Sequence, residues 1–570
     1  MLWVRWRRGT LIGREDDLAS RPELLARVRA KQQVGSTPAK PLRIILEFEK
    51  PRAADAIAAA INERLQIRVE AARLSEAHGL EGAHDGLAQF MAVTIIGVEA
   101  ADVADSPFEL GYALADATDA VTAEPELGTD FYMVPRTGER QLEGVDRFPP
   151  GCWVDPKDDP TAEQPHWAVK KIKAEDAWSL APKPGGKAKG EGVLVFQPDT
   201  GVADHVELEP GMFDLNLAYD FINNKKGAAD PMDYSGNPGH GTGTSSVVAS
   251  RESGKIAGAA PLATLVPLRA VTSVIVFDHG RVAVAVEYAR RNGARVITMS
   301  LGGAFSSALH TAIRGAIADG IIVMAAAGNC VGFVVWPARY DEVIAVAGYN
   351  INDRPWIGSC HGNEVDITAP GEFVPRANRA PQSGGSPIDV HGGQGTSFAV
   401  ALTAGVAALW IGHFGITAIR KSLRSGETVQ DRFVALLQET SWQPPGFDTS
   451  EFGAGIIDAV KLLKHGLQPQ AAEPEMVAEP EMVFADPLRS VRTMLAELAP
   501  SSMEAVADAS AGPPNSRRYA AELSHLALLK RKKMTSGVAL ERVAVDTPPS
   551  ETLQRELTQA GRTDLLAALS

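Results

Sequence analysis

Residues 281–303 read RVAVAVEYARRNGARVITMSLGG, and this stretch decides the fold. Its first half places apolar residues at helical spacing, and its second half is a short run of apolar, β-branched residues, so a helix followed by a strand is predicted. The same alternation continues on both sides, at residues 264–270, 307–320, 321–329 and 343–350. Alternating helices and near-continuous apolar strands predict an α/β fold, a doubly wound parallel sheet with helices on both faces.

The α/β pattern begins near the apolar run GVLVF at residues 192–196 and ends near residue 466, so we take residues 189–466 as one domain. Residues 1–130 carry a different pattern. Strands are expected at RIILEF, IRVEAARL, FMAVTIIGV and AVTAEP, and helices at RAADAIAAAINERL and PFELGYALADAT. The resulting order, β-α-β-β-α-β, predicts a small α+β domain.

Two Pro-rich stretches separate the remaining parts. Residues 131–188 are rich in Pro, Gly, Asp and Lys and are predicted to be a junction, and residues 467–485 contain the imperfect repeat EPEMVAEPEMVF, which is typical of a linker. Residues 486–570 contain amphipathic helical stretches. This helical C-terminal region either packs on the protein itself or binds a protein partner.

Composition narrows the class of protein. The 570 residues include 70 acidic and 56 basic side chains, a net charge of −14, which argues against nucleic acid as a partner. The three cysteines form no CxxC pair, so neither a zinc site nor a disulfide framework is expected. No secretory h-region follows the N-terminal arginines, and no stretch approaches the ~18 apolar residues of a membrane span. A cytoplasmic protein without membrane contact is therefore expected, with secretion as the alternative.

Four polar residues lie at the ends of predicted strands or at the starts of predicted helices in the α/β domain. Asp199 ends its first strand, Asn329 follows another strand, and His240 and Ser397 begin helices rich in small or apolar residues. Sheets of this type bind ligands at the carboxyl ends of their strands. Glycine flanks each of the four residues, as expected where the backbone turns sharply or approaches a substrate.

These residue types suit acyl transfer. Serine becomes a nucleophile when a base accepts its proton, and histidine titrates near neutrality and can later return that proton. A carboxylate fixes the imidazole tautomer, while an amide donor and a backbone N–H can bind the oxyanion.

The motifs DTGV, HGT, AAAGN and GTSFA, in this order along the chain, resemble the signatures of the subtilisin-like serine protease family (subtilase, peptidase S8). Supporting segments are SLGG at residues 300–303, VDITAPG at 365–371 and FGAGIIDA at 452–459. The resemblance covers about residues 165–466. It implies a serine endopeptidase that works through an acyl-enzyme, with peptides or proteins as substrates.

The resemblance also implies residue roles. Ser397 would be the nucleophile, His240 the general base and acid, Asp199 the residue that orients His240, and Asn329 the oxyanion donor. Two segments would bind the substrate by β-strand addition and form the first specificity pocket: Ser300, Leu301 and Gly302, and Ala326, Ala327 and Gly328. No cofactor is expected for catalysis and no metal ligands are assigned, although members of the family bind structural calcium.

The sequence departs from the family pattern at three positions. Ala401 stands where the family usually has proline, Pro198 precedes Asp199 in place of an apolar residue, and Gly243 replaces a common second histidine. None of these changes removes a catalytic group. Residues 1–130 resemble the propeptide of the family in element order and in the phrase AVTAEPEL, so they would assist folding or inhibit the protease, or else act as a separate recognition domain.

Alternatives remain for single residues and for the whole chain. Ser397 could be a helix N-cap, His391 a rival base, and Cys330 either a wall of the specificity pocket or a small buried filler. The alternative function is a pseudoprotease, a scaffold that binds peptides in the groove without cutting them.

Overall fold

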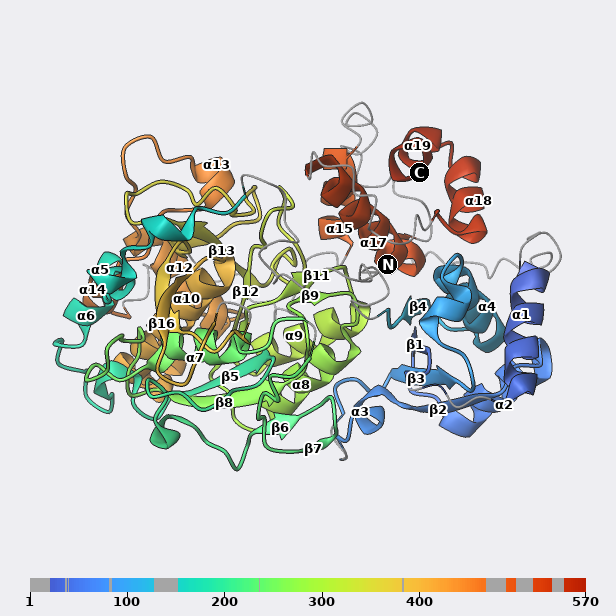
Figure 1. Ribbon diagram of the computed structural model, residues 1–570, viewed down its shortest axis with the longest axis horizontal. Coiled ribbons are helices and arrows are strands. Elements are labelled where there is room, and N and C mark those ends of the chain that lie inside the picture. The colour runs from blue at the N-terminus through green and yellow to red at the C-terminus, as the bar shows by residue number, and fades with distance from the viewer. Residues whose placement is uncertain are drawn as a thin grey trace, which may run out of the picture.

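The computed structural model of the protein describes residues 21–35, 38, 40–80, 82, 85–127, 152–234, 236–381, 384–467, 488–498, 516–535 and 548–570. Figure 1 shows three parts: an N-terminal domain in blue, a large central domain in green to orange, and C-terminal helices in red that lie over the junction between the other two. Residues 131–151 of the predicted junction and residues 468–485 of the predicted linker lie outside the described residues.

The N-terminal domain has the predicted β-α-β-β-α-β order, with a short helix between its second and third strands. Its antiparallel sheet has the order β2-β3-β1-β4. The strands are β1 (Arg43–Glu47), β2 (Val69–Arg73), β3 (Phe90–Ile95) and β4 (Thr122–Pro125), and the helices are α1 (Arg21–Val34), α2 (Ala54–Leu65), α3 (Leu74–Ala77) and α4 (Pro107–Thr118).

The central domain contains the predicted parallel sheet, with eight strands in the order β14-β13-β12-β10-β5-β8-β6-β7. Only β7 (Lys225–Lys226) runs antiparallel to its neighbour. The parallel strands are β5 (Leu194–Asp199), β6 (Tyr219–Asp220), β8 (Thr264–Arg269), β10 (Val296–Met299), β12 (Ile322–Ala326), β13 (Ile344–Tyr349) and β14 (Ile367–Pro370).

Alternate residues of these strands enter two separate cores. Val296 of β10 packs in the core that contains α7 (His240–Ala249) and α10 (Thr396–Phe414), whereas Ile297 packs in the core that contains α8 (Gly280–Arg291) and α9 (Ser307–Ala318). A strand must be apolar on both faces for this to happen, which explains the near-continuous apolar runs.

The apolar helix α10 lies in the centre of the domain. Among the helices in the described part of the chain, it alone is long and apolar enough to cross a membrane, and all of it is buried inside the protein. The smaller elements of the domain are α5 (Trp167–Lys171), α6 (Ala174–Ala177), α11 (Ile416–Ser422), α12 (Val429–Thr440), α13 (Thr449–Phe452), α14 (Ala459–His465), β9 (Ile275–Val276), β11 (Gly302–Gly303), β15 (Val374–Ala377) and β16 (Val390–Gly393).

The second half of the predicted junction packs into the central domain. Trp167 of α5 and Trp178 after α6 are buried, and their indole N–H groups donate to the carbonyls of Phe373 and Ala259. The Pro, Gly and Lys residues nearby indicate loops, but the tryptophans anchor this stretch to the core.

The C-terminal helices pack on the protein itself. They are α15 (Arg489–Leu498), α17 (Ser516–Thr535), α18 (Glu551–Gln559) and α19 (Thr563–Leu569). Ser490 of α15 accepts a hydrogen bond from the Trp336 indole of the central domain, and Thr552 of α18 bonds the Glu109 carboxylate of the N-terminal domain.

Candidate active site

Asp199 and His240 meet at the carboxyl edge of the sheet. Asp199 ends β5 and His240 begins α7, so the fold brings together two residues that are 41 positions apart. His240 Nδ1 lies 2.8 Å from Asp199 Oδ1 and 3.1 Å from Oδ2. Because a carboxylate only accepts, Nδ1 donates, and Nε2 is the nitrogen that can accept a proton. The His240 side chain keeps 15% of its surface exposed, which leaves the ring accessible.

The Asp199 carboxylate is fixed from other sides as well. Thr200 N donates to Oδ1 at 2.7 Å, and Thr244 Oγ1, one turn into α7, lies 3.2 Å from Oδ2. Gly241 has to be glycine here, because a Cβ would collide with the carbonyl oxygen of Gly201. The helix start can therefore approach the strand end closely enough for the His240–Asp199 bond to form.

Asp230 supports the same corner and was not identified from the sequence. It accepts hydrogen bonds from Gly239 N at 2.7 Å and Thr200 Oγ1 at 3.1 Å. Burial raises the pKa of its carboxyl above the ordinary value. Asp230 lies in an irregular loop, so no local pattern distinguishes it from a surface aspartate.

Ser397 lies at the start of α10, with 5% of its surface exposed. Gly395, at φ +149°, takes a backbone conformation that favours glycine and precedes the helix. The Ser397 hydroxyl donates to the carbonyl oxygen of Ser300 at 3.3 Å, and Ser300 Oγ donates to the Ser397 carbonyl at 3.0 Å. The structure thus places the predicted nucleophile at the same edge as His240, but without a hydrogen bond between them.

Asn329 follows β12 and is locked to the same helix start. Its Oδ1 accepts from Thr396 N at 3.0 Å and Thr396 Oγ1 at 2.8 Å, and Thr396 Oγ1 in turn accepts from Gly328 N at 3.1 Å. With Oδ1 occupied in this way, Nδ2 is the group that remains to donate. Nδ2 lies near Gly395, because a Cβ added to that glycine would be 3.5 Å from it.

The two predicted substrate-binding segments lie at the carboxyl ends of the neighbouring parallel strands β10 and β12. Ser300, Leu301 and Gly302 follow β10, and Ala326, Ala327 and Gly328 end and follow β12. Val335 lies between the two segments. Its backbone N–H donates to Ala327 O, and its Cγ2 would lie 2.9 Å from a Cβ on Gly328 and would collide with one on Gly302.

Known proteins resemble this domain closely. The model of the subtilase family matches residues 190–452. Thermitase from Thermoactinomyces vulgaris is 32% identical over 258 residues, which are 44% of this chain and 84% of thermitase. Subtilisin Savinase from Lederbergia lenta is 30% identical over 301 residues, 52% of this chain and 98% of the relative, and subtilisin DY from Bacillus licheniformis is 32% identical over 251 residues, 42% and 85%.

The chain belongs to the subtilase family. This subtilase is a serine-type endopeptidase with the α/β fold that the sequence predicted. The relatives match only about half of the chain, so the N-terminal domain and the C-terminal helices have to be understood from their own contacts.

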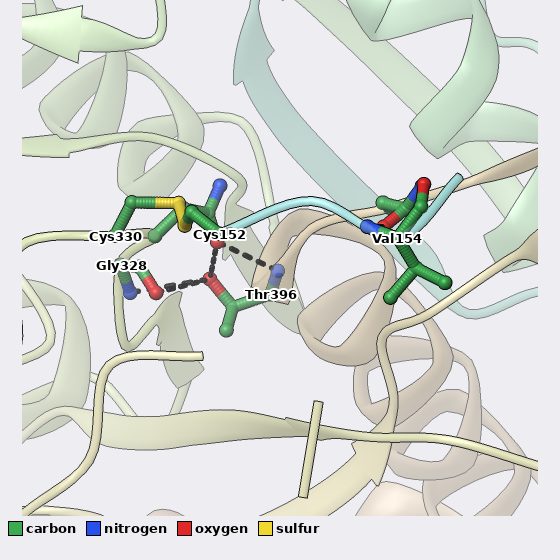
Figure 2. Close-up of a disulfide and its surroundings, with 7 residues drawn as sticks. Cys152, Val154, Gly328, Cys330 and Thr396 are labelled. Carbon is green, nitrogen blue, oxygen red and sulfur yellow. Dashed lines mark hydrogen bonds between the residues drawn. A yellow bond between two sulfur atoms is a disulfide. The ribbon is translucent and has the colours of Figure 1, made fainter. Parts of the chain in front are cut away.

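The subtilase contains a disulfide that the sequence analysis did not expect. Cys152 and Cys330 are bonded, with a Cα–Cα distance of 5.9 Å and a separation of 178 positions in the chain. Figure 2 shows the disulfide beside Gly328 and Thr396. The expectation that there is no disulfide was therefore wrong, and the half-buried Cys330 is one end of this bond and not a small buried filler. A pair so distant in sequence leaves no CxxC signal.

The disulfide ties the start of residues 152–159 to the residue after Asn329. Val154 N donates to Gln394 Oε1 at 3.0 Å, and Gln394 Nε2 donates back to Val154 O at 2.8 Å. Asp159 accepts from Gly392 N at 2.7 Å. This segment therefore lies along the residues that lead to Ser397.

His391 does not compete with His240 as a base. Its nitrogens lie 3.9 Å from Asp159 and 3.5 Å from Asp389, and more than half of its side chain is exposed. Cys360, the third cysteine, is buried beneath Gly328, and burial raises the pKa of its thiol to about 11, so it packs there as a neutral group. Within the described residues, no group of three or more His, Cys, Asp or Glu is arranged to hold a metal ion.

Proposed function

We propose that this endopeptidase uses Ser397, His240 and Asp199 as its catalytic triad and Asn329 as an oxyanion donor. The observation that carries the proposal is the bond between His240 Nδ1 and the buried Asp199 carboxylate, because it leaves Nε2 as the nitrogen that can act as the base.

The reaction needs one local change. Rotation about the Ser397 Cα–Cβ bond would move Oγ from the Ser300 carbonyl toward His240 Nε2, and catalytic hydrogen bonds often shorten only when substrate binds. Oγ then attacks the peptide carbonyl as His240 takes its proton. Asn329 Nδ2 and the Ser397 N–H, which lies in the first turn of α10, hold the oxyanion. His240 protonates the leaving amine, and water hydrolyses the acyl-enzyme.

The N-terminal domain is proposed to be an intramolecular inhibitor and folding aid. Glu124 of β4 accepts from Ser306 Oγ and Ser307 N, both at 2.7 Å, at the start of α9. Glu126 contacts Gly280 at the start of α8. Carboxylates stabilise helix N-termini, so the domain would favour the folded arrangement of both helices. A separate recognition domain is the alternative.

The second candidate, peptide binding without cleavage, is favoured by one observation. The Ser397 hydroxyl bonds Ser300 O and not His240. Fluorophosphonate labelling decides between the candidates: the purified full-length protein and Ser397→Ala are treated side by side and read by intact mass. Labelling that requires Ser397 supports the triad. If removal of the first 151 residues, which keeps Cys152, yields a folded protein that still does not label, the triad proposal fails.

The same spectra test the role of the N-terminal domain. If the active protein loses a fragment that ends between residues 127 and 152 while Ser397→Ala stays intact, the subtilase cuts itself there, as an inhibitory domain requires. An isolated N-terminal fragment that does not slow the protease in trans would contradict inhibition.

We also propose that the protein works in an oxidising compartment, which is the alternative to the cytoplasmic location expected from its N-terminus. The Cys152–Cys330 disulfide supports this proposal, because such bonds are rare in the cytosol of mesophiles. Alkylation of the protein in intact producing cells, followed by mass measurement, would show two modified thiols in addition to Cys360 if the bond is absent there.

A further inference from the structure

The segment predicted to bind substrate ends at Gly302, and from this residue to Ala304 the backbone is already paired on both edges. Gly302 N donates to Val274 O at 2.9 Å and Ala304 N to Val276 O at 3.3 Å, which makes β11 and β9 a two-stranded parallel pair. On the other edge, Gly303 N donates to Trp336 O at 2.7 Å. A peptide that adds as a strand needs unpaired backbone groups, and the amides from Gly302 to Ala304 are occupied.

We propose that β9 is an internal occupant of the substrate-binding edge, and that the C-terminal helix α17 and the N-terminal domain together hold it there. The described structure is then a closed state of the protease. The proposal rests on the proposed substrate-binding role of residues 300–302 and names a means of regulating that site.

Helix α17 contacts the chain just after each strand of the β9–β11 pair. Phe277, directly after β9, packs edge-on against the ring of His525 with centroids 5.2 Å apart. Phe305, two residues after β11, donates its N–H to Ser524 Oγ at 3.0 Å. Both α17 residues are buried. Separating β9 from β11 would therefore pull at least one of these segments away from α17.

The N-terminal domain contacts the same region from the other side. Phe108 of α4 also packs edge-on against His525, with ring centroids 5.3 Å apart, so His525 contacts a phenylalanine of each domain. A cavity of about 20 Å³ lies at this junction and is lined by residues of the N-terminal domain, the central domain and α17. It has room for no more than about one water. Glu124 accepts hydrogen bonds from Ser306 and Ser307 at the start of α9, the helix that follows β11.

Helix α17 is in turn bound to the N-terminal domain. Tyr112 Oη donates to Glu522 Oε2 at 2.8 Å, and both side chains are buried. Arg518 pairs with Asp116 and lies over the Tyr112 ring. Because His525 of α17 packs against both Phe108 and Phe277, loss of the N-terminal domain would remove the Phe108 contact. Release of the N-terminal domain would then loosen β9 and open the edge to a peptide.

Hydrogen–deuterium exchange on full-length Ser397→Ala tests the proposal without turnover. A peptide that covers residues 300–306 reports the Gly302 and Ala304 amides, and a peptide over residues 294–299 reports the sheet strand β10. Adding His525→Ala is expected to speed exchange of the first peptide ~10-fold and leave the second unchanged, because two aromatic contacts are lost. His525→Phe keeps the ring packing and should restore slow exchange.

Binding of fluorescein-labelled casein to the same proteins gives the functional readout. His525→Ala should bind it at least ~5-fold more tightly than the parent, since each aromatic contact contributes enough for such a change. Tyr112→Phe, which breaks the link to Glu522, should act in the same direction, and Tyr288→Phe, whose hydroxyl bonds only Leu217 O within the central domain, is its matched control.

Unchanged exchange of residues 300–306 in His525→Ala, or equal acceleration of residues 294–299, would overturn the proposal. Casein that binds the parent while the Gly302 and Ala304 amides stay protected would overturn it as well. Fluorophosphonate labelling of the protein that retains Ser397 is a separate measurement of the triad. A negative exchange or casein result together with positive labelling would therefore reject this proposal and leave the proposed triad standing.

Discussion

Asp199 accepts hydrogen bonds from the backbone and from two side chains, and this fixes which nitrogen of His240 faces the substrate side. With Thr200 N and Thr244 Oγ1 also on the carboxylate, the Asp199 side chain cannot turn without losing several bonds. The imidazole is therefore oriented before substrate arrives, which lowers the cost of reaching the reactive geometry.

Asn329→Ala should lower kcat by ~10²–10³-fold, the range typical of removing this kind of donor in subtilisin. KM should change little, because the donor acts on charge that develops only in the transition state. Steady-state cleavage of a peptide substrate measures both constants. Asn352→Ala, an exposed asparagine in a turn, is the matched control, and equal kcat losses in the two variants would contradict the oxyanion role.

Val335→Ala should shift substrate preference toward larger apolar side chains before the scissile bond. Val335 fills the space between Gly302 and Gly328, so its truncation should deepen the pocket. One or two methylenes in such a pocket change kcat/KM by ~10–200-fold. A peptide series with Ala, Leu and Phe at that position measures the shift. If the neighbouring Val334→Ala gives the same change, loosening of the loop and not pocket depth is the cause.

At the scale of elements, the close approach of strand ends to helix starts creates the site. β5 ends beside the start of α7, and β12 ends beside the start of α10, where Thr396 bonds both Gly328 and Asn329. The segment of residues 152–159 also supports the site. Its Cys152 forms the disulfide to Cys330, the residue next to Asn329, and so fixes that residue from outside the sheet.

Replacing both Cys152 and Cys330 with serine should lower the free energy of unfolding by roughly 2–5 kcal/mol, since the bond closes a long loop. kcat should fall by about 10–100-fold as Asn329 loses its anchored neighbour. Chemical denaturation and peptide cleavage measure the two effects. Reductant should reproduce both in the wild-type protein and change nothing in the double variant. A kcat insensitive to either treatment would show that the disulfide does not position Asn329.

At the scale of the whole molecule, three parts share one buried junction. The N-terminal domain, the central domain and α17 meet around His525, and burial lowers the pKa of this imidazole to about 3, so it stays neutral. Burial also raises the pKa of Glu522 to about 7. Tyr112 and Glu109 face it from α4, Ser550 donates to it, and Arg21 pairs with Glu109.

The pKa of Glu522 makes the junction dependent on pH. A carboxyl whose pKa is raised on folding stabilises the fold fully below the unfolded pKa, near 4.5, and loses that contribution as pH rises through about 7. The unfolding temperature of full-length Ser397→Ala should therefore fall between pH 4.5 and about 7, and Glu522→Gln should reduce the fall. Glu556→Gln on α18 is the control. Identical slopes in the two variants would exclude Glu522 as a source of the pH dependence.

The alternation of helices and strands indicated the fold class, because it depends on local periodicity. The candidate triad was implied by the order of motifs that resemble the subtilase signatures. Asp199 and Asn329 lie at or just after strand ends, and His240 and Ser397 lie at helix starts, as the sequence predicted. Other features depend on contacts between segments far apart in the chain. They are the Cys152–Cys330 bond, the pairing of β9 with Gly302, the support from Asp230 and the packing of His525 against two phenylalanines. Local spacing carries no information on such pairs, so only the tertiary structure decided them.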